Sequence, residues 1–338
     1  MSISVKVHVC VRIISIHQWF QGNYMNSTQC NYEEKYYLFF IFIICCICFL
    51  FTPYPSCAED TISEVASPDS SAEGIHEGTA ADSTEPGTRR LFEPLMADPR
   101  WPHFSIAYHY YTDDEELKNV GATSFGETLP LFNGKGPLNG EWGMGIQAAV
   151  FAIFDLDAPS YDLINADYWV GIPFEYRVNA LSGLIRIYHQ SSHIGDEYLL
   201  RNRIDRVNLS YESVDVKLSY DLADWFRVYS GAGYLIRKEP KDLKPWSAQF
   251  GFEIRSPRTY LERALRPIAG VDIKTREELS WRTDISLRSG VEFYLKRGRS
   301  GYYKIQFTAG YFNGYSPNGQ FYERQIEYLS LGSHFYFD

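Results

Sequence analysis

The chain has 338 residues, a formal net charge of −10 and 16% aromatic residues. No cluster of lysine and arginine dominates any stretch, and nucleic-acid binding needs a concentrated basic face, so nucleic acid is excluded as a partner. The six cysteines all lie within the first 57 residues, and the rest of the chain is free of thiols: Cys10, Cys30, Cys45, Cys46, Cys48 and Cys57.

An apolar run near the start of the chain indicates export. Residues 38–51 form this run, and it is shorter than the roughly 20 residues that a membrane-spanning helix needs. Small residues and then acidic residues follow, which predicts a signal peptide cleaved after Ala58. A start at Met25 would give a more ordinary signal. A lipoprotein anchored through Cys57 is the alternative. Residues 1–58 are therefore interpreted as an upstream extension and signal peptide.

The next stretch has the composition of a disordered linker. Residues 59–90 are rich in Ser, Ala, Thr, Glu, Asp and Gly and contain almost no large apolar side chain. Such a segment cannot bury enough surface to order itself. We expect the folded part to comprise residues 91–338, beginning with the proline-broken segment LFEPLMADPRWP.

From residue 103 onward the chain consists of strand-like segments separated by turns, and no further long apolar run occurs. Alternating side chains and aromatic or β-branched residues mark about twelve such segments. They are residues 103–111, 121–132, 141–154, 168–178, 181–191, 204–220, 225–236, 246–255, 265–275, 281–295, 302–312 and 324–337.

These segments predict an all-β fold, an antiparallel transmembrane β-barrel of about twelve strands. Many reach the roughly 9–11 residues that a tilted strand needs to cross a bilayer, whereas strands of soluble proteins have about 5–6. Short and long connections alternate, as in outer-membrane barrels with short periplasmic turns and long outer loops. A soluble β-sandwich would show similar alternation and is the alternative. A barrel predicts location in the bacterial outer membrane, with membrane lipid and the outer-membrane assembly machinery as partners.

Aromatic residues near the strand ends fit the girdles of a membrane barrel. The chain ends in Phe337 followed by Asp338, so an aromatic residue stands one place before the terminal position usual in such barrels. The girdle candidates are Tyr110, Tyr111, Trp142, Trp169, Trp225, Trp246 and Trp281.

A histidine and a serine stand together near the end of one predicted strand. If Ile185 and Ile187 face lipid, alternation places His189 and Ser191 on the same outward face. A serine beside a histidine base is the arrangement of an activated nucleophile, and it needs a third group to orient the imidazole. The sequence therefore offers Ser191 as nucleophile and His189 as base.

The pair resembles outer-membrane phospholipase A, and a similar His-x-Ser pair occurs in the lipid A deacylase family. The resemblance implies ester hydrolysis of lipid, with an Asn or Glu from the neighbouring strand orienting the histidine. Asn208 is the obvious candidate for that role, although Val207, Leu209 and Tyr211 place its side chain inward. Asn202 is a substitute. The chain departs from the phospholipase in having Ser192-His193 where that family has Asn-Gly.

Two other interpretations of this segment remain open. In the first, the polar residues form a hydrogen-bonded rim and an ordered loop: His189, Ser191, His193, Asp196 and Glu197. In the second, His189, His193 and Asp196 bind zinc, because two imidazoles and a carboxylate suit that ion.

Acidic residues gather in the predicted outer loop FDLDAPSYDLINADY. Oxygen ligands on such a loop suit Ca²⁺, although the spacing is not that of an EF-hand. Solvated acids explain the same pattern, and calcium would fit the phospholipase resemblance. The candidate ligands are Asp155, Asp157, Asp162 and Asp167, with Asn165 among them.

The side chains predicted to face the lumen are polar and of both charges. Opposite charges crossing a narrow barrel close it, so a plugged barrel is favoured over a general porin. A later segment, YSPNGQFY, has the composition of a turn. The predicted lumen residues are Arg186, Gln190, Arg206, Asn208, Ser210, Glu212, Asp284 and Arg288.

Five strings give a wider resemblance: LFEPLMADPRWPHFS, FDLDAPSYDLINADYWVGIP, RIYHQSSHIGDEYL, RVNLSYE and SPNGQFY. They are similar to the bacterial domain-of-unknown-function family 1207, and they extend from residue 91 to near the C-terminus. The resemblance implies an exported envelope protein of Gram-negative-type bacteria and no particular activity. Two functions are therefore carried forward: a structural or passive-transport barrel, and a lipid ester hydrolase.

Overall fold

The structure is a computed structural model that describes residues 89–114, 116–261, 264–296 and 302–337. The predicted signal peptide and nearly all of the predicted linker lie outside the described residues, so the domain boundaries at 58 and 90 stay predictions.

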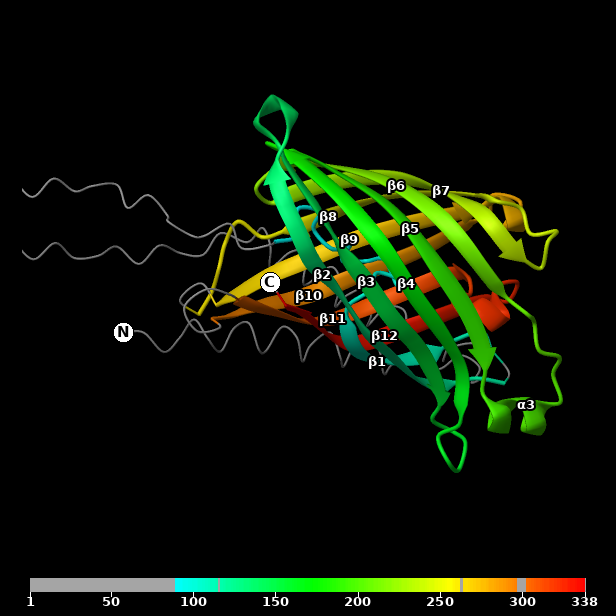
Figure 1. Ribbon diagram of the computed structural model, residues 1–338. Helices are drawn as coiled ribbons and strands as arrows, with labels where there is room; N and C mark the ends of the chain where they lie inside the picture. Colours follow the sequence, from blue (N-terminus) through cyan, green and yellow to red (C-terminus); the bar gives the residue numbers. More distant parts are fainter. Residues whose placement is uncertain (1–88, 115, 262–263, 297–301, 338) are drawn as a thin grey trace, which may run out of the picture. The chain divides into compact units, whose positions relative to one another are not determined.

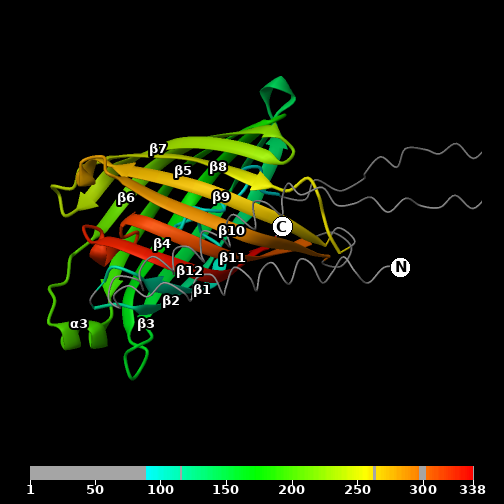
Figure 2. The same ribbon diagram turned by 180° about the vertical axis from the view of Figure 1, so that it is seen from behind.

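Twelve antiparallel strands close into a barrel in chain order, with β1 paired to β12 (Figures 1 and 2). Ten of the strands have 12 or more residues, which suits tilted crossing of a bilayer. The strands are β1 Phe104–Tyr111, β2 Asn119–Lys135, β3 Glu141–Asp155, β4 Leu163–Val178, β5 Leu181–Ile194, β6 Ser210–Ala223, β7 Phe226–Glu239, β8 Trp246–Arg255, β9 Leu265–Arg276, β10 Thr283–Lys296, β11 Tyr302–Tyr315 and β12 Gln325–Phe337.

The prediction of a twelve-stranded antiparallel barrel is confirmed. β8 has the predicted bounds, and the largest difference is at β6, which begins at Ser210 instead of residue 204. Residues 196–202 of the preceding connection form a short helix that the sequence analysis did not predict, α3 Asp196–Asn202. The described residues also contain three 3-10 turns: η1 Pro137–Asn139, η2 Glu277–Leu279 and η3 Gly319–Phe321.

The two ends of the barrel differ. The C-terminal end of β12 and the short turns at residues 179–180 and 224–225 lie at one end, whereas α3 lies at the other (Figure 1). Long connections, including residues 195–209 and 316–324, lie at the α3 end. We call the α3 end the outer mouth, because outer-membrane barrels carry their long loops outside the cell.

The outward face of the strands is apolar. Along β5, Ile185 and Ile187 are 49% and 57% exposed, while Arg186 between them is buried in the lumen. Exposed apolar side chains at the same parity recur around the barrel, as lipid contact requires. They include Ile106, Phe125, Ile146, Ile172, Leu218, Phe250, Phe307 and Leu331. No helix in the described part of the chain is long and apolar enough to cross a membrane.

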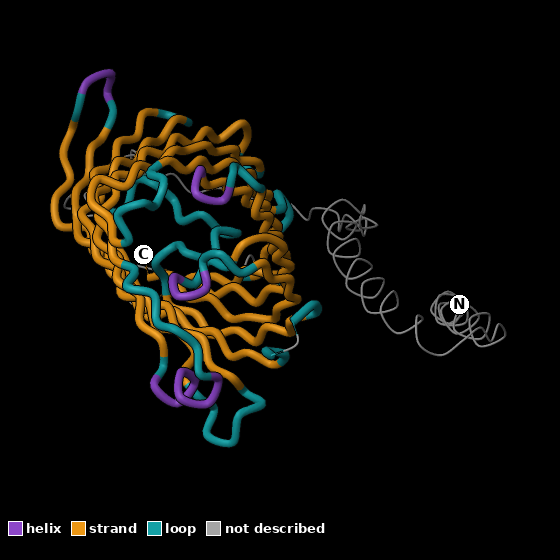
Figure 3. Tube along the Cα trace, turned by 90° about the vertical axis from the view of Figure 1, so that its right-hand side faces the viewer, coloured by secondary structure: helices purple, strands orange, loops and turns teal. Residues whose placement is uncertain are grey.

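The chain segment that precedes β1 lies inside the lumen. Phe92, Leu95 and Trp101 are at most 2% exposed and pack against Leu184 and Tyr229 of the barrel wall. Figure 3 shows loop segments inside the ring of strands. Residues 89–103 are called the plug below. Their burial agrees with the expectation of a closed barrel, although the sequence analysis treated this segment only as the start of the fold.

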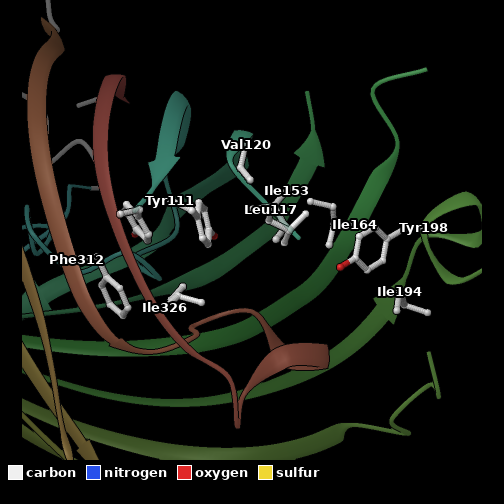
Figure 4. Close-up of a cluster of buried hydrophobic side chains, with 10 residues drawn as sticks. Tyr111, Leu117, Val120, Ile153, Ile164, Ile194, Tyr198, Phe312 and Ile326 are labelled. Carbon is white, nitrogen blue, oxygen red and sulfur yellow. The ribbon is translucent and has the colours of Figure 1, made fainter. Parts of the chain in front are cut away.

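A second apolar cluster closes part of the outer mouth. It joins Tyr111, Val120, Ile153 and Phe312 to Tyr198 of α3, and several of its side chains converge in Figure 4. Tyr111 and Trp169 are 3% and 5% exposed, so these two girdle candidates are buried and do not face lipid. Trp225, Trp246 and Trp281 are 38–50% exposed, as a girdle requires.

Candidate functional site

His189 and Ser191 both lie on the outward face of β5, near the outer mouth. Tyr188 and Gln190, on either side of His189 in the sequence, line a cavity in the lumen, so strand alternation turns His189 and Ser191 outward. The prediction that these two residues share the lipid-facing side is therefore confirmed by the strand's burial pattern. Their catalytic roles stay predictions.

The neighbouring strand supplies a carboxylate to the histidine. Glu212 of β6 stands directly opposite His189, and its Oε1 lies 3.1 Å from His189 Nδ1. Both side chains are more than one-third exposed, so solvent weakens their attraction as an ion pair. The contact nevertheless orients the ring and leaves Nε2, the other ring nitrogen, for a second partner.

Ser191 stands two residues from His189 on the same face. In the register, Ser191 lies opposite Tyr168 of β4 and Ser210 of β6. The hydrogen bond to Glu212 is the one found for His189 among the described residues, and none joins its ring to the Ser191 hydroxyl. Hydrogen bonds between catalytic groups often form only when substrate is bound. The face thus presents a serine, a histidine and an orienting carboxylate side by side.

The residue predicted to orient the histidine occupies a different place. Asn208 precedes β6 and is exposed at the rim, whereas Glu212 fills the orienting position. Asn202 bonds the carbonyl of Tyr198 within α3. Val214, Val216 and Leu218 share the parity of Glu212, and this run of apolar residues was the sequence signal that would have placed Glu212 outward.

The predicted lumen residues divide into two groups. The structure confirms Arg186, Gln190, Asp284 and Arg288, which line the internal cavities. The assignment was wrong for four residues, because Leu209 and Tyr211 face the interior at the crowded outer mouth, and their apolar character does not mark a lipid face there. The misplaced residues are Arg206 and Asn208, which are exposed, and Ser210 and Glu212, which face outward.

The residues of the zinc alternative do not form a metal site. His193 is exposed, stacks edge-on against Tyr168 and lies 3.5 Å from the Arg206 guanidinium. Asp196 is exposed on α3. Among the described residues, no group of three or more His, Cys, Asp or Glu side chains is placed to hold a metal ion.

The four aspartates proposed for calcium bind other partners. Arg201 of α3 contacts Asp155 at 2.6 Å and Asp162 at 2.5 Å, so a guanidinium occupies the position between these two carboxylates. Asp157 accepts two hydrogen bonds from Asn119. Arg201 and Asn119 thus occupy oxygen atoms of three of the four carboxylates, and calcium binding by these residues stays a prediction.

Asp167, the fourth aspartate, is buried in the lumen, 2.8 Å from Arg100 of the plug. Its Oδ2 also accepts a hydrogen bond from the Gly319 amide. Gln320, the next residue, donates its side-chain amide to the carbonyls of Ser192 and Val207, at 2.9 and 2.8 Å. Val207 N donates back to Gln320 Oε1 at 3.0 Å. η3 therefore bridges β5 to the segment that enters β6, directly behind the outward pair.

One protein-family model matches most of the chain. The model of a family described as "Protein of unknown function (DUF1207)" matches residues 63–337. No curated protein sequence is significantly similar to the chain.

Solved structures of outer-membrane proteins are among those similar to this chain. Outer membrane phospholipase A from Escherichia coli is 10% identical, with 73% of this chain and 94% of that chain covered and a TM-score of 0.48. The Salmonella typhi outer membrane phospholipase dimer with bound calcium is 10% identical, with 73% of this chain and 93% of that chain covered and a TM-score of 0.47. The transport unit of the Escherichia coli autotransporter AIDA-I is 9% identical, with 73% of this chain and 93% of that chain covered and a TM-score of 0.38. At these values the likeness concerns architecture and carries no argument about activity.

Proposed function

The chain belongs to the family of proteins of unknown function designated DUF1207, and for this member we propose the role of an outer-membrane hydrolase that cleaves acyl esters of lipids at the outer leaflet. The observation that carries the proposal is the contact between His189 Nδ1 and Glu212 Oε1 on the same outward face as Ser191. Polar and ionisable side chains on a lipid-facing surface are costly unless they have a function or lie near the interface.

The three residues divide the chemistry between them. Ser191 Oγ attacks the acyl carbonyl carbon while His189 Nε2 takes the hydroxyl proton. The C–O bond to the lipid alcohol then breaks, and His189 returns the proton to that leaving oxygen. Water, activated by His189, attacks the acyl-serine and releases a fatty acid. Glu212 keeps Nε2 directed toward Ser191 and stabilises the charged imidazolium.

The proposal is favoured over passive transport in the resting state because the plug lies in the lumen and packs against its wall. The outward face is free of that obstruction. In an exported barrel, a reactive group beside the outer leaflet contacts lipid. The ester bonds of membrane lipids lie at the depth of the interface, within reach of that group.

Fatty-acid release tests the function directly. We expect the refolded full chain to release fatty acid from micelles of phospholipid or lipid A, and a serine-reactive fluorophosphonate to label Ser191. Mass spectrometry of the labelled peptide would locate the adduct. Ca²⁺ is included throughout, so that a metal requirement cannot conceal activity. A protein with the heat-modifiable migration of a folded barrel but without release or label would contradict the proposal.

Replacing the orienting carboxylate is expected to slow hydrolysis without unfolding the barrel. Glu212→Ala removes the partner of His189 Nδ1, and loss of such a group lowers kcat by about 10²- to 10⁴-fold in serine hydrolases. Asn208→Ala is the matched control, because Asn208 is exposed nearby and has no role in the proposed site. Steady-state kinetics on one ester substrate would measure both. A large loss in Asn208→Ala with little change in Glu212→Ala would reassign the orienting role.

A further inference from the structure

The plug is attached to the wall by side chains rather than by strand pairing. Glu175 of β4 accepts hydrogen bonds from the amides of Leu91 and Phe92, at 2.6 and 3.1 Å. Glu253 of β8 accepts one from the amide of Met96 at 2.5 Å. Both carboxylates are buried. The barrel therefore keeps its complete ladder of twelve strands whether or not the plug is in place.

Cationic side chains from other strands bind the plug's carbonyl groups. Arg227 of β7 donates to the carbonyls of Glu93 and Pro94, at 2.9 and 3.2 Å. Arg288 of β10 donates to the carbonyl of Met96 at 2.5 Å. These partners surround the plug from several directions. All are charged groups that water would solvate well, so withdrawal of the plug would expose them to water in the lumen, beside Leu184 and Tyr229.

The apolar contacts keep the plug seated at rest. Phe92, Leu95 and Trp101 are at most 2% exposed within the lumen, and exposing them to water is unfavourable. The attachment therefore combines a hydrophilic wall with three apolar anchors. This combination suits a closure that opens infrequently. The apolar anchors oppose withdrawal of the plug, whereas water can solvate the charged wall groups that withdrawal exposes.

A cavity already leads from the outer mouth to the plug. It has a volume of about 200 Å³, and residues 99 and 100 of the plug form part of its lining. Its wall combines cations and anions, including Arg186, Lys217 and Asp215. η3 lines the same cavity through Gly319, so the space passes beside η3 and reaches the plug beyond it.

We propose that residues 89–103 are a displaceable closure, and that the barrel conducts small hydrophilic solutes when this segment leaves the lumen. This activity is separate from ester hydrolysis, because the lumen and the outward face lie on opposite sides of the strands. An opening left by one segment of chain would admit ions and small polar molecules and exclude folded proteins.

A disulfide can lock the closure in place. Gly270 of β9 faces the plug, and a Cβ atom added there would lie 3.5 Å from Ala97 Cβ, with no closer contact. This separation lies within the range of Cβ–Cβ distances in disulfides. Residues 58–338 contain no cysteine, so in the variant Ala97→Cys/Gly270→Cys the new pair is remote in sequence from the natural cysteines.

Planar-bilayer recordings in KCl across a range of voltages would test the proposal with the full chain. We expect wild type to open intermittently, Ala97→Cys/Gly270→Cys to open at least tenfold less often until reductant is added, and Leu95→Ser to open more often. Each single-cysteine variant controls for the substitutions themselves. The proposal would be overturned if the oxidised double variant opened as often as wild type. It would also be overturned if neither wild type nor Leu95→Ser showed any openings.

The hydrolase proposal can fail without affecting this result. Ser191→Ala should leave the openings and their sensitivity to reductant unchanged, because Ser191 does not face the lumen. Conductance altered by Ser191→Ala to the same extent as by the locked variant would contradict the separation of the two faces.

Discussion

Substitution of Ser191 or of His189 by alanine is expected to lower ester hydrolysis by at least about 10³-fold. Loss of either nucleophile or base removes the covalent route, and single removals in serine hydrolases cost nearly as much as removal of the whole group. Neither side chain contributes to the lumen, so the barrel should fold as wild type does. Fatty-acid release at saturating substrate measures the loss, and heat-modifiable migration on gels checks the fold.

Ser210→Ala provides the matched control for Ser191→Ala. Ser210 is the residue opposite Ser191 in the β5–β6 ladder and has the same outward parity. Its removal should leave the rate within about threefold of wild type, because Ser210 has no histidine two residues away on its strand. Equal losses from Ser191→Ala and Ser210→Ala would show that neither serine acts as the nucleophile and that the surface contributes only to lipid contact.

Glu253→Ala is expected to destabilise the barrel by about 3–5 kcal/mol, the usual cost of breaking a buried ion pair by removing one partner. The Glu253 side chain is fully buried and contacts Arg227 at 3.3 Å and Arg255 at 3.0 Å. It also accepts the hydrogen bond from the Met96 amide. The substitution therefore leaves buried positive charge without its partner and loosens the plug at the same time.

Denaturant unfolding in detergent micelles, followed by tryptophan fluorescence, measures this loss. Lys135→Ala is the comparison, because Lys135 forms an ion pair with Glu141 while its side chain is 81% exposed. An exposed pair contributes at most about 1 kcal/mol, so this variant should remain close to wild type. Similar midpoints for Glu253→Ala and Lys135→Ala would contradict the importance of the buried network.

The strand pattern was predictable because alternation is a local property. Each residue of a strand points to the opposite side from its neighbour, so Ile185 and Ile187 were enough to place His189 and Ser191 outward. β8 has the predicted bounds because turns, which are also marked by local sequence, flank it on both sides. The number of strands and their closure followed from strand length and from the alternating loops.

The pairing of Glu212 with His189 was not predictable from local pattern alone. The outer mouth is filled by apolar side chains from several elements, so Leu209 and Tyr211 point inward, and the rule that apolar residues face lipid fails there. Applying that rule to Leu209 and Tyr211 led to the wrong prediction that Glu212 faces the lumen. Only the register between β5 and β6 sets Glu212 opposite His189.

The sequence by itself determined an all-β barrel with an apolar outer face and an outward histidine and serine, because strand periodicity and residue polarity are encoded in neighbouring positions. Tertiary structure alone decided which carboxylate meets His189, which partners the loop aspartates take, and that residues 89–103 occupy the lumen. Each of these depends on contacts between residues distant in the chain. Arg201 reaches Asp155, and Glu253 reaches Met96, across 46 and 157 positions. Closure of the barrel brings such residues together, and no local pattern records which of them make contact.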